Sequence, residues 1–218
     1  MQYYLDSKVE LQGFTAKYYD TILNTISFGV YSNFIKNAIE SIEINANDKL
    51  LDFGAGTGRN ALLMSKYLST EGEILGLEIS DEMIEQFNHK FENIENIKII
   101  NRRIDKPFEL EGKFDKVFIS FVIHGFPHEV RTEIIKNAYN NLKEGGEFVI
   151  LDFSEFIVKE MPLYARIPFT TIECKYAFEF VEKDWKVILS EFGFGNFSEK
   201  FFLKNYVRLL KAEKLSEK

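Results

Sequence analysis

The stretch LLDFGAGTGRN, residues 50–60, places three glycines within five positions directly after an apolar run. A glycine inside a helix or strand costs roughly 0.5–1 kcal/mol relative to alanine, so three glycines so close together predict a loop. Gly54, Gly56 and Gly58 let this loop turn sharply and let a ligand touch the main chain. A loop between a strand and the helix that follows it lies at the carboxyl edge of an open α/β sheet, where such folds bind ligands.

Short apolar runs alternate with amphipathic segments from residue 49 onward, and this alternation predicts strands and helices in turn. The expected strands cover residues 49–53, 73–78, 97–100, 114–120 and 147–153. The expected helices between them cover residues 60–68, 81–91 and 127–142. Strands that alternate with helices predict a parallel sheet with helices on both faces.

Two local signals mark the ends of these helices. Ser80 is a suitable N-cap, because Asp81 and Glu82 follow it in the positively polarised first turn. The glycines of KEGGE, residues 143–147, predict the stop of the helix before them. We therefore expect the fifth strand to begin at Glu147.

The two ends of the chain differ from this alternating part. Residues 196–203 and 205–213 predict two strands joined by a tight turn, which adds one antiparallel strand. Residues 1–45 predict a helical N-terminal cap, and residues 154–182 predict short helices that form a lid. The expected fold class is α/β, a three-layer Rossmann-like sandwich. It is one domain, residues 1–218, whose mostly parallel seven-stranded sheet ends in an antiparallel C-terminal hairpin strand.

Composition limits the classes of partner. The net charge is −7 with both signs mixed along the chain, which argues against nucleic acid as the main partner. Cys174 is the only cysteine, so an internal disulfide is excluded and no metal site is expected. The start of the chain shows no signal-peptide pattern, and no apolar run approaches the roughly 20 residues of a membrane span. We expect a cytoplasmic protein, while peripheral membrane contact and the choice between monomer and homodimer stay open.

The glycine loop fits two classes of cofactor. A dinucleotide favours G-x-G-x-x-G, but Arg59 stands where the third glycine belongs. S-adenosylmethionine has no phosphate and needs an acceptor for its ammonium group. Asp52 lies two residues before the first glycine, at the end of a strand, where a carboxylate reaches such an ammonium directly or through water. A cap for the amides of the loop is the alternative role of Asp52.

The next expected strand ends on a second carboxylate. Glu78 lies 24 positions after Gly54, near the spacing of about 20 at which an acidic residue binds ribose hydroxyls. Because either cofactor carries a ribose, Glu78 supports nucleoside binding without choosing between them.

Four stretches resemble, in order, the motifs of the class I SAM-dependent methyltransferases: LLDFGAGTGRN, LGLEISDEMIEQ, FDKVFISFVIHGF and LKEGGEFVILDF. The resemblance runs over about residues 14–212. The stretch FTAKYYDTILNTISFG, near the N-terminus, is similar to the opening of the ubiquinone/menaquinone C-methyltransferases. This resemblance implies a methyltransferase with S-adenosylmethionine as its cofactor and a small-molecule methyl acceptor as its partner.

The resemblance also implies roles for individual residues. Asp52 and the three glycines would surround the methionine part of the cofactor, and Glu78 would bind its ribose. The other cofactor-binding residues that it implies are Tyr19, Ile79, Met83, Arg103, Ile104, Ser120 and Phe121. The family places an acidic and then a small residue where this chain has Arg102 and Arg103. Because arginine cannot accept a hydrogen bond, the adenine contact would pass to the main chain of Arg103 or to Asp105.

His124 follows the fourth strand at the ligand edge and is the candidate catalytic base, with a structural role as the alternative. The quinone enzymes carry arginine at this place, so His124 is a departure from them. Aromatic residues of the lid predict an apolar cavity for a small aromatic or lipophilic acceptor: Tyr164, Phe169, Tyr176, Phe178 and Phe180. Methylation of a thiol or another small metabolite, a non-catalytic SAM-binding protein and an NAD-type oxidoreductase remain the alternatives.

Overall fold

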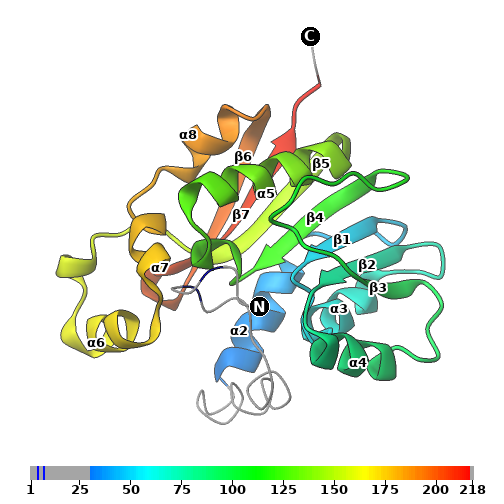
Figure 1. The fold of residues 1–218 in the computed structure, drawn as a ribbon, viewed down its shortest axis with the longest axis horizontal. Helices are drawn as coiled ribbons and strands as arrows, with labels where there is room; N and C mark the ends of the chain where they lie inside the picture. Colours follow the sequence, from blue (N-terminus) through cyan, green and yellow to red (C-terminus); the bar gives the residue numbers. More distant parts are fainter. Residues whose placement is uncertain (1–3, 5–6, 8–29, 217–218) are drawn as a thin grey trace.

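A seven-stranded sheet runs through the computed structural model, which describes residues 4, 7 and 30–216. The strands are ordered β3-β2-β1-β4-β5-β7-β6 across it (Figure 1). The first five pair in parallel, and β7 is antiparallel to both of its neighbours. Their bounds are β1 Lys49–Phe53, β2 Glu73–Glu78, β3 Ile97–Asn101, β4 Phe114–Ser120, β5 Leu142–Phe153, β6 Phe194–Phe202 and β7 Val207–Lys214. The expected mostly parallel sheet with one antiparallel hairpin strand is confirmed.

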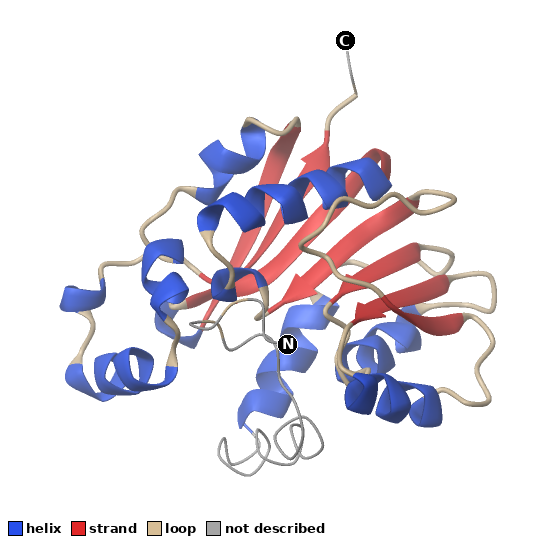
Figure 2. Ribbon diagram, in the orientation of Figure 1, coloured by secondary structure: helices blue, strands red, loops and turns tan. Residues whose placement is uncertain are grey.

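Helices cover both faces of this sheet (Figure 2). The described α-helices are α2 Val30–Glu40, α3 Arg59–Met64, α4 Asp81–Lys90, α5 His128–Asn141, α6 Leu163–Ile172, α7 Lys175–Phe180 and α8 Trp185–Ser190. Residues of α2, α3 and α4 share one hydrophobic cluster with the sheet, and residues of α5, α7 and α8 share the other. The predicted three-layer Rossmann-like sandwich is therefore confirmed.

Alternation along the strands sends successive side chains to the two clusters. Leu51 and Val117 belong to the cluster under α5, whereas Leu50 and Phe118 belong to the cluster under α2 and α3. Each is at most 1% exposed, and full burial of such a side chain stabilises the fold by roughly 1.5–3 kcal/mol. Strands that are apolar on both faces are typical of a parallel sheet that helices cover on both sides.

The expected glycine stop before the fifth strand is wrong in one respect. The helix α5 ends at Asn141, but β5 begins at once with Leu142 instead of at Glu147. Leu142 pairs with Phe114 and Glu147 with Lys116, so the glycines lie in an irregularity of the ladder. Gly145 has φ +73°, a left-handed conformation that suits the irregular turn within the strand. Residues with a side chain disfavour this conformation, whereas glycine adopts it readily.

The N-terminal cap and the lid are described unequally. Of the cap, α2 packs its apolar face on the sheet through Phe34, Ile35, Ala38 and Ile39, and Ile42 of the turn after it joins them; all five are buried. Tyr19 lies outside the described residues. The predicted lid consists of the short helices α6 and α7 with a 3₁₀ turn at Val158–Glu160. Within the described part of the chain, none of the helices is both long and apolar enough to cross a membrane.

Candidate active site

The glycine loop is clamped to the end of the neighbouring strand. The amides of Gly54 and Ala55 donate to the carbonyl of Leu77 at 2.9 and 3.0 Å, and the amide of Gly56 donates to Oε2 of Glu78 at 3.0 Å. Gly56 has φ +55°, and a Cβ placed there would meet only the sulfur of Met83 within 4 Å. The main chain at Gly56 therefore offers an open, close approach to a ligand.

The Glu78 carboxylate joins two loops. Besides Gly56, the amides of Ile79 and Ser80 donate to its Oε1 at 2.7 and 3.0 Å. A carboxylate has roughly four acceptor sites, so one site on Oε2 is left after these three bonds. Glu78 thus fixes the loops after β1 and β2 and keeps one acceptor site for a hydroxyl group.

Asp52 is a buried acid near the carboxyl end of β1. Asp52 is only 1% exposed, and its Oδ2 has no hydrogen-bond partner among the described residues. Burial and, after it, the charge of Glu78 raise the pKa of Asp52 to about 7. A buried carboxylate oxygen without a partner is costly unless a cationic ligand meets it, and an ammonium group is such a ligand.

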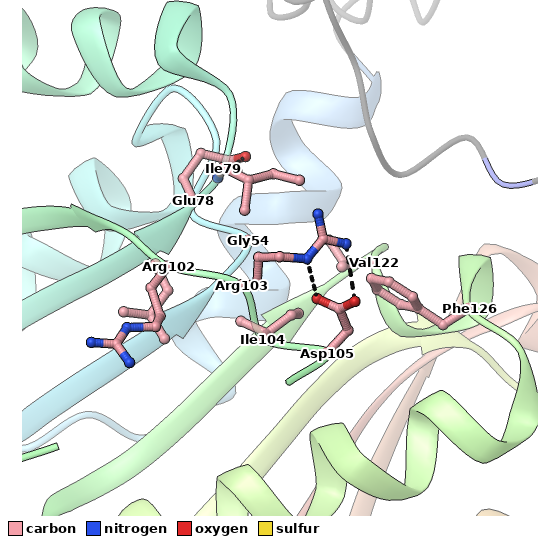
Figure 3. A pocket seen from close by; sticks show the side chains of 10 residues that line it. Gly54, Glu78, Ile79, Arg102, Arg103, Ile104, Asp105, Val122 and Phe126 are labelled. Carbon is pink, nitrogen blue, oxygen red and sulfur yellow. Dashed lines mark hydrogen bonds and ion pairs between the residues drawn. The ribbon is translucent and has the colours of Figure 1, made fainter. Parts of the chain in front are cut away.

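A pocket opens between the ends of β2, β3 and β4 (Figure 3). It brings together five predicted cofactor-binding residues: Gly54, Glu78, Ile79, Arg103 and Ile104. Leu77, Val122 and Phe126 also line it and were missed by the sequence reasoning, although the last two closely follow the predicted Ser120 and Phe121. Met83 does not line this pocket; it is buried beneath Gly56.

The expected adenine subsite is occupied by an ion pair. Arg103 donates from Nε and Nη2 to the two carboxylate oxygens of Asp105, both at 2.9 Å. Arg102, the other arginine in place of the family's acidic and small residues, is exposed and points away from this pair (Figure 3). Of the alternatives for this subsite, Asp105 is the one whose side chain lines the pocket with a hydrogen-bond acceptor.

The end of β4 carries a strained residue. Phe121 directly follows Ser120, the last residue of the strand, and has φ +52°, which a non-glycine residue adopts at a cost. Its ring packs edge-on against Phe34 of α2 and Phe153 of β5. Both Ser120 and Phe121 are half-buried. They lie at the end of β4, the direct neighbour of β1, at the point where the strand order reverses.

His124 bridges the sheet and the lid. Its Nδ1 lies 2.7 Å from Oδ1 of Asp152 in β5, and its Nε2 lies 3.4 Å from Oε2 of Glu173 at the end of α6. Burial lowers the pKa of His124, but the charges and hydrogen bonds of Asp152 and then Glu173 outweigh it and raise the pKa to about 10. An imidazole protonated at neutral pH has no lone pair to take a proton, so this geometry favours the structural alternative.

A second cavity, of about 410 Å³, lies under the lid. Its walls are mostly apolar and aromatic and include Tyr164 and Phe169, as the sequence predicts. Two charged residues, Glu173 and Lys204, also line it. The other predicted lid aromatics do not line it, and Phe180 instead stacks on Trp185 in the core. The remaining aromatic walls come from β5, the segment after it and the β6–β7 turn: Phe153, Phe156 and Tyr206.

The fold and its cleft at the β1/β4 switch point define a Rossmann-like α/β class of protein. Residues 44–194 match a family described as a methyltransferase domain. The chain belongs to this methyltransferase-domain family. The match confirms the resemblance to the class I SAM-dependent methyltransferases, and with it the expected methyltransferase activity and cofactor.

Individual proteins similar to this chain agree with the family. A demethylmenaquinone methyltransferase of Staphylococcus carnosus is 28% identical over 204 residues, 84% of this chain and 83% of that protein. A SAM-dependent methyltransferase from Aquifex aeolicus has a similar fold, with a TM-score of 0.62 and 16% identity over 83% of this chain and 89% of that one. An O-methyltransferase family protein from Burkholderia thailandensis has a TM-score of 0.68 and is 13% identical, and the match covers 90% of this chain and 59% of that one.

Proposed function

We propose that this chain transfers a methyl group from S-adenosylmethionine to a small aromatic or lipophilic acceptor bound under the lid. The observation that carries the proposal is the largely apolar cavity of about 410 Å³, whose lining residue Phe153 contacts Phe121 at the strained end of β4. A cavity of this size and lining suits one organic ring system with an apolar substituent. The demethylmenaquinone methyltransferases among its relatives support a hydroxylated quinone-type acceptor as the first one to test.

The residues around the glycine loop fit the cofactor. The unpaired Oδ2 of Asp52 suits its ammonium, the remaining acceptor site of Glu78 suits a ribose hydroxyl, and the open main chain at Gly56 admits close contact. When bound, S-adenosylmethionine supplies an electrophilic methyl group on a positively charged sulfur. Ser120 and Phe121, at the end of β4, are proposed to face the methionine part from the opposite side of the switch point.

Methyl transfer is an in-line displacement, so the protein acts chiefly by orienting the acceptor and excluding water. The half-buried rings of Phe121 and Phe153 pack edge-on with their centroids 6.1 Å apart, and Phe153 also lines the lid cavity. Aromatic faces near a sulfonium also stabilise its charge. We propose that His124 contributes by holding Glu173, and with it the lid, in place, and that an acidic acceptor group loses its proton without this imidazole.

Transfer of a labelled methyl group tests the proposal. The purified protein is incubated with methyl-labelled S-adenosylmethionine and, in turn, hydroxylated naphthoquinols with and without an isoprenoid chain, simple phenols, thiols, amines and carboxylic acids. We expect label in a quinol or phenol product. Label found only in a thiol would favour small-thiol methylation, and binding of the cofactor without transfer to any acceptor would favour a non-catalytic protein.

A further inference from the structure

One carboxylate lines the largely apolar cavity under the lid. Glu173 directly follows the last residue of α6, and its carboxylate is the only one among the described residues that line this cavity. The Glu173 side chain is 22% exposed, so the group is partly withdrawn from water. Because an uncompensated charge beside apolar walls is costly, we expect a partner for it in the protein.

A buried histidine is that partner. Nε2 of His124 lies 3.4 Å from Oε2 of Glu173, and Nδ1 of His124 lies 2.7 Å from Oδ1 of Asp152. Asp152 is 1% exposed and belongs to β5, so the core of the domain sets the position of the imidazole. The pKa of His124, about 10, keeps the imidazole protonated at neutral pH. The three groups then carry one negative charge together, and a proton added to Glu173 would make them neutral.

The Glu173 carboxylate keeps capacity for a ligand. Among the described residues, His124 is the only ion-pair or hydrogen-bond partner of its side chain, and the contact is made by Oε2. A carboxylate has roughly four acceptor sites, so Oε1 is open to a donor. A hydroxyl group of a molecule in the cavity is such a donor.

The loop after β4 connects Glu173 to the pocket beside the glycine loop. Val122 of this loop lines that pocket, and His124, two residues further on, contacts Glu173. The ring of His124 also packs edge-on against Phe153, another residue of the lid cavity, with the ring centroids 5.0 Å apart. Glu173 therefore belongs to the wall of the lid cavity that contacts the cofactor side of the molecule.

The other charged residue of the cavity cannot accept a proton. Nζ of Lys204 donates to the hydroxyl of Tyr164 at 2.6 Å, and this hydrogen bond raises the pKa of Lys204, so its ammonium stays protonated. Tyr164 lies near the start of α6, and the nine residues from it to Glu173 span roughly 13 Å of helix. The cavity thus has a cation near one end of α6 and an open carboxylate at the other.

We infer that Glu173 is the catalytic base, which accepts the proton of the acceptor's hydroxyl group as the methyl group is transferred. This inference rests on the proposed function, because it concerns the acceptor of the same reaction. His124 does not touch the acceptor and, with Asp152 behind it, acts as a positioning residue. The acceptor is accordingly a phenol or quinol whose hydroxyl group must lose a proton.

The proton transfer balances without a further reactant. The O–H bond of the acceptor breaks, its electron pair stays on the acceptor, and the proton moves to Glu173. The oxygen forms a bond to the methyl carbon while the bond from that carbon to sulfur breaks, and the electron pair of the broken bond stays on sulfur. Where a ring carbon is methylated instead, that carbon loses its hydrogen as a proton and the product is the oxyanion of the methylated ring. Glu173 then releases its proton to water.

Two naphthols of different acidity test the inference. The labelled-methyl assay at pH 7 compares 1-naphthol, which is almost entirely protonated, with 4-nitro-1-naphthol, which is almost entirely ionised. Glu173→Gln keeps the shape of the side chain and removes its basicity, so it should lower kcat for 1-naphthol at least about 100-fold. The loss with the nitro compound should stay below about fivefold, because that acceptor has no proton to give up. Affinity for S-adenosylhomocysteine, measured by calorimetry, should be unchanged.

The matched control is Glu160→Gln. Glu160 is an exposed acid of the same lid, in the 3₁₀ turn Val158–Glu160, and does not line the cavity, so both naphthols should react at the unmodified rate. An equal loss with both naphthols in Glu173→Gln would show a structural role, and an unchanged rate would show none. Either result would overturn the inference and leave the proposed function standing. Failure of the unmodified protein to methylate either naphthol or any quinol would overturn both.

Discussion

Asp52, the last but one residue of β1, and Glu78, the last residue of β2, lie on neighbouring parallel strands. Burial and, after it, the charge of Glu78 raise the pKa of Asp52 to about 7. The two acids differ in their hydrogen bonding. Glu78 is held by three backbone amides, whereas Oδ2 of Asp52 has no partner among the described residues. One carboxylate therefore organises the loops, and the other is left to meet a cation.

The pH dependence of cofactor binding follows from this difference. An ammonium group pairs with ionised Asp52, so affinity for S-adenosylhomocysteine should rise by roughly tenfold or more between pH 5.5 and 7.5. Calorimetry across this range measures the change. In Asp52→Asn the affinity at pH 7.5 should be weaker by at least about 1 kcal/mol and nearly independent of pH. If Asp52→Asn binds S-adenosylhomocysteine as tightly as the unmodified protein, with the same pH dependence, Asp52 is excluded as the ammonium acceptor.

The same substitution should affect stability in the opposite direction. The folded-state pKa of Asp52 lies above its unfolded value of 3.8, so the stability linked to this group is present below about pH 4 and is lost as the pH rises through about 7. Asp52→Asn should therefore have the higher free energy of unfolding at pH 8, measured by urea denaturation. A less stable variant at pH 8 would contradict the assignment of an unpaired buried charge.

Gly58 should be far less tolerant of a side chain than Gly112. Both glycines have positive φ, +80° at Gly58 and +87° at Gly112. A Cβ added at Gly58 would lie 2.6 Å from Phe91 and 2.7 Å from Phe87, whereas a Cβ added at Gly112 would meet no atom within 4 Å. Gly112→Ala should cost roughly 1–2 kcal/mol for the left-handed conformation alone. Gly58→Ala should cost about 1–3 kcal/mol more because it overpacks the core. Equal urea midpoints for the two variants would refute this packing.

His124 should stabilise the fold as a protonated bridge between Asp152 and Glu173. Its folded-state pKa of about 10 exceeds the ordinary 6.5, so its stabilisation is complete below about pH 6.5 and is lost as the pH rises through 10. His124→Gln should lower the free energy of unfolding at pH 7 by about 3 kcal/mol, the cost of breaking a buried pair. The difference between the two proteins should shrink toward pH 10, and a difference that grows with pH would contradict the bridge.

Filling the lid cavity should block the acceptor and spare the cofactor. Ala165 lines the cavity, while Leu163 on the same helix is 61% exposed and does not. Ala165→Phe should raise the acceptor KM or abolish transfer, with affinity for S-adenosylhomocysteine unchanged, because the added ring takes up acceptor space. Leu163→Phe is the matched control and should keep both properties. Unchanged acceptor kinetics in Ala165→Phe would place the acceptor elsewhere.

Much of the fold was predictable because its signals are local. Apolar runs bounded by polar turns located the strands, and the N-cap at Ser80 is confirmed by its bond from the amide of Met83. The start of β5 was mispredicted, because glycines 145 and 146 fit a helix stop and an irregular strand equally well. Only the pairing of Leu142 with Phe114, a long-range contact, decides between them.

The parts of the candidate site that the main chain forms could be predicted from the sequence. The parts in which side chains from distant segments contact one another were less predictable. The glycine loop and Glu78 follow from spacing along one strand-turn-helix unit. The partners of His124 come from β5 and the lid, and the turn after β6 adds Tyr206 to the cavity. Periodicity carries no information on such contacts. Nor does it show that the Arg103 side chain folds back onto Asp105.

A crystal structure of the protein with S-adenosylhomocysteine would locate the cofactor-binding site. We expect the ligand along residues 54–58, with its ammonium against Oδ2 of Asp52 and a ribose hydroxyl on Glu78. A ligand bound in another part of the molecule, or one in this cleft that leaves Oδ2 of Asp52 without a partner, would contradict this expectation.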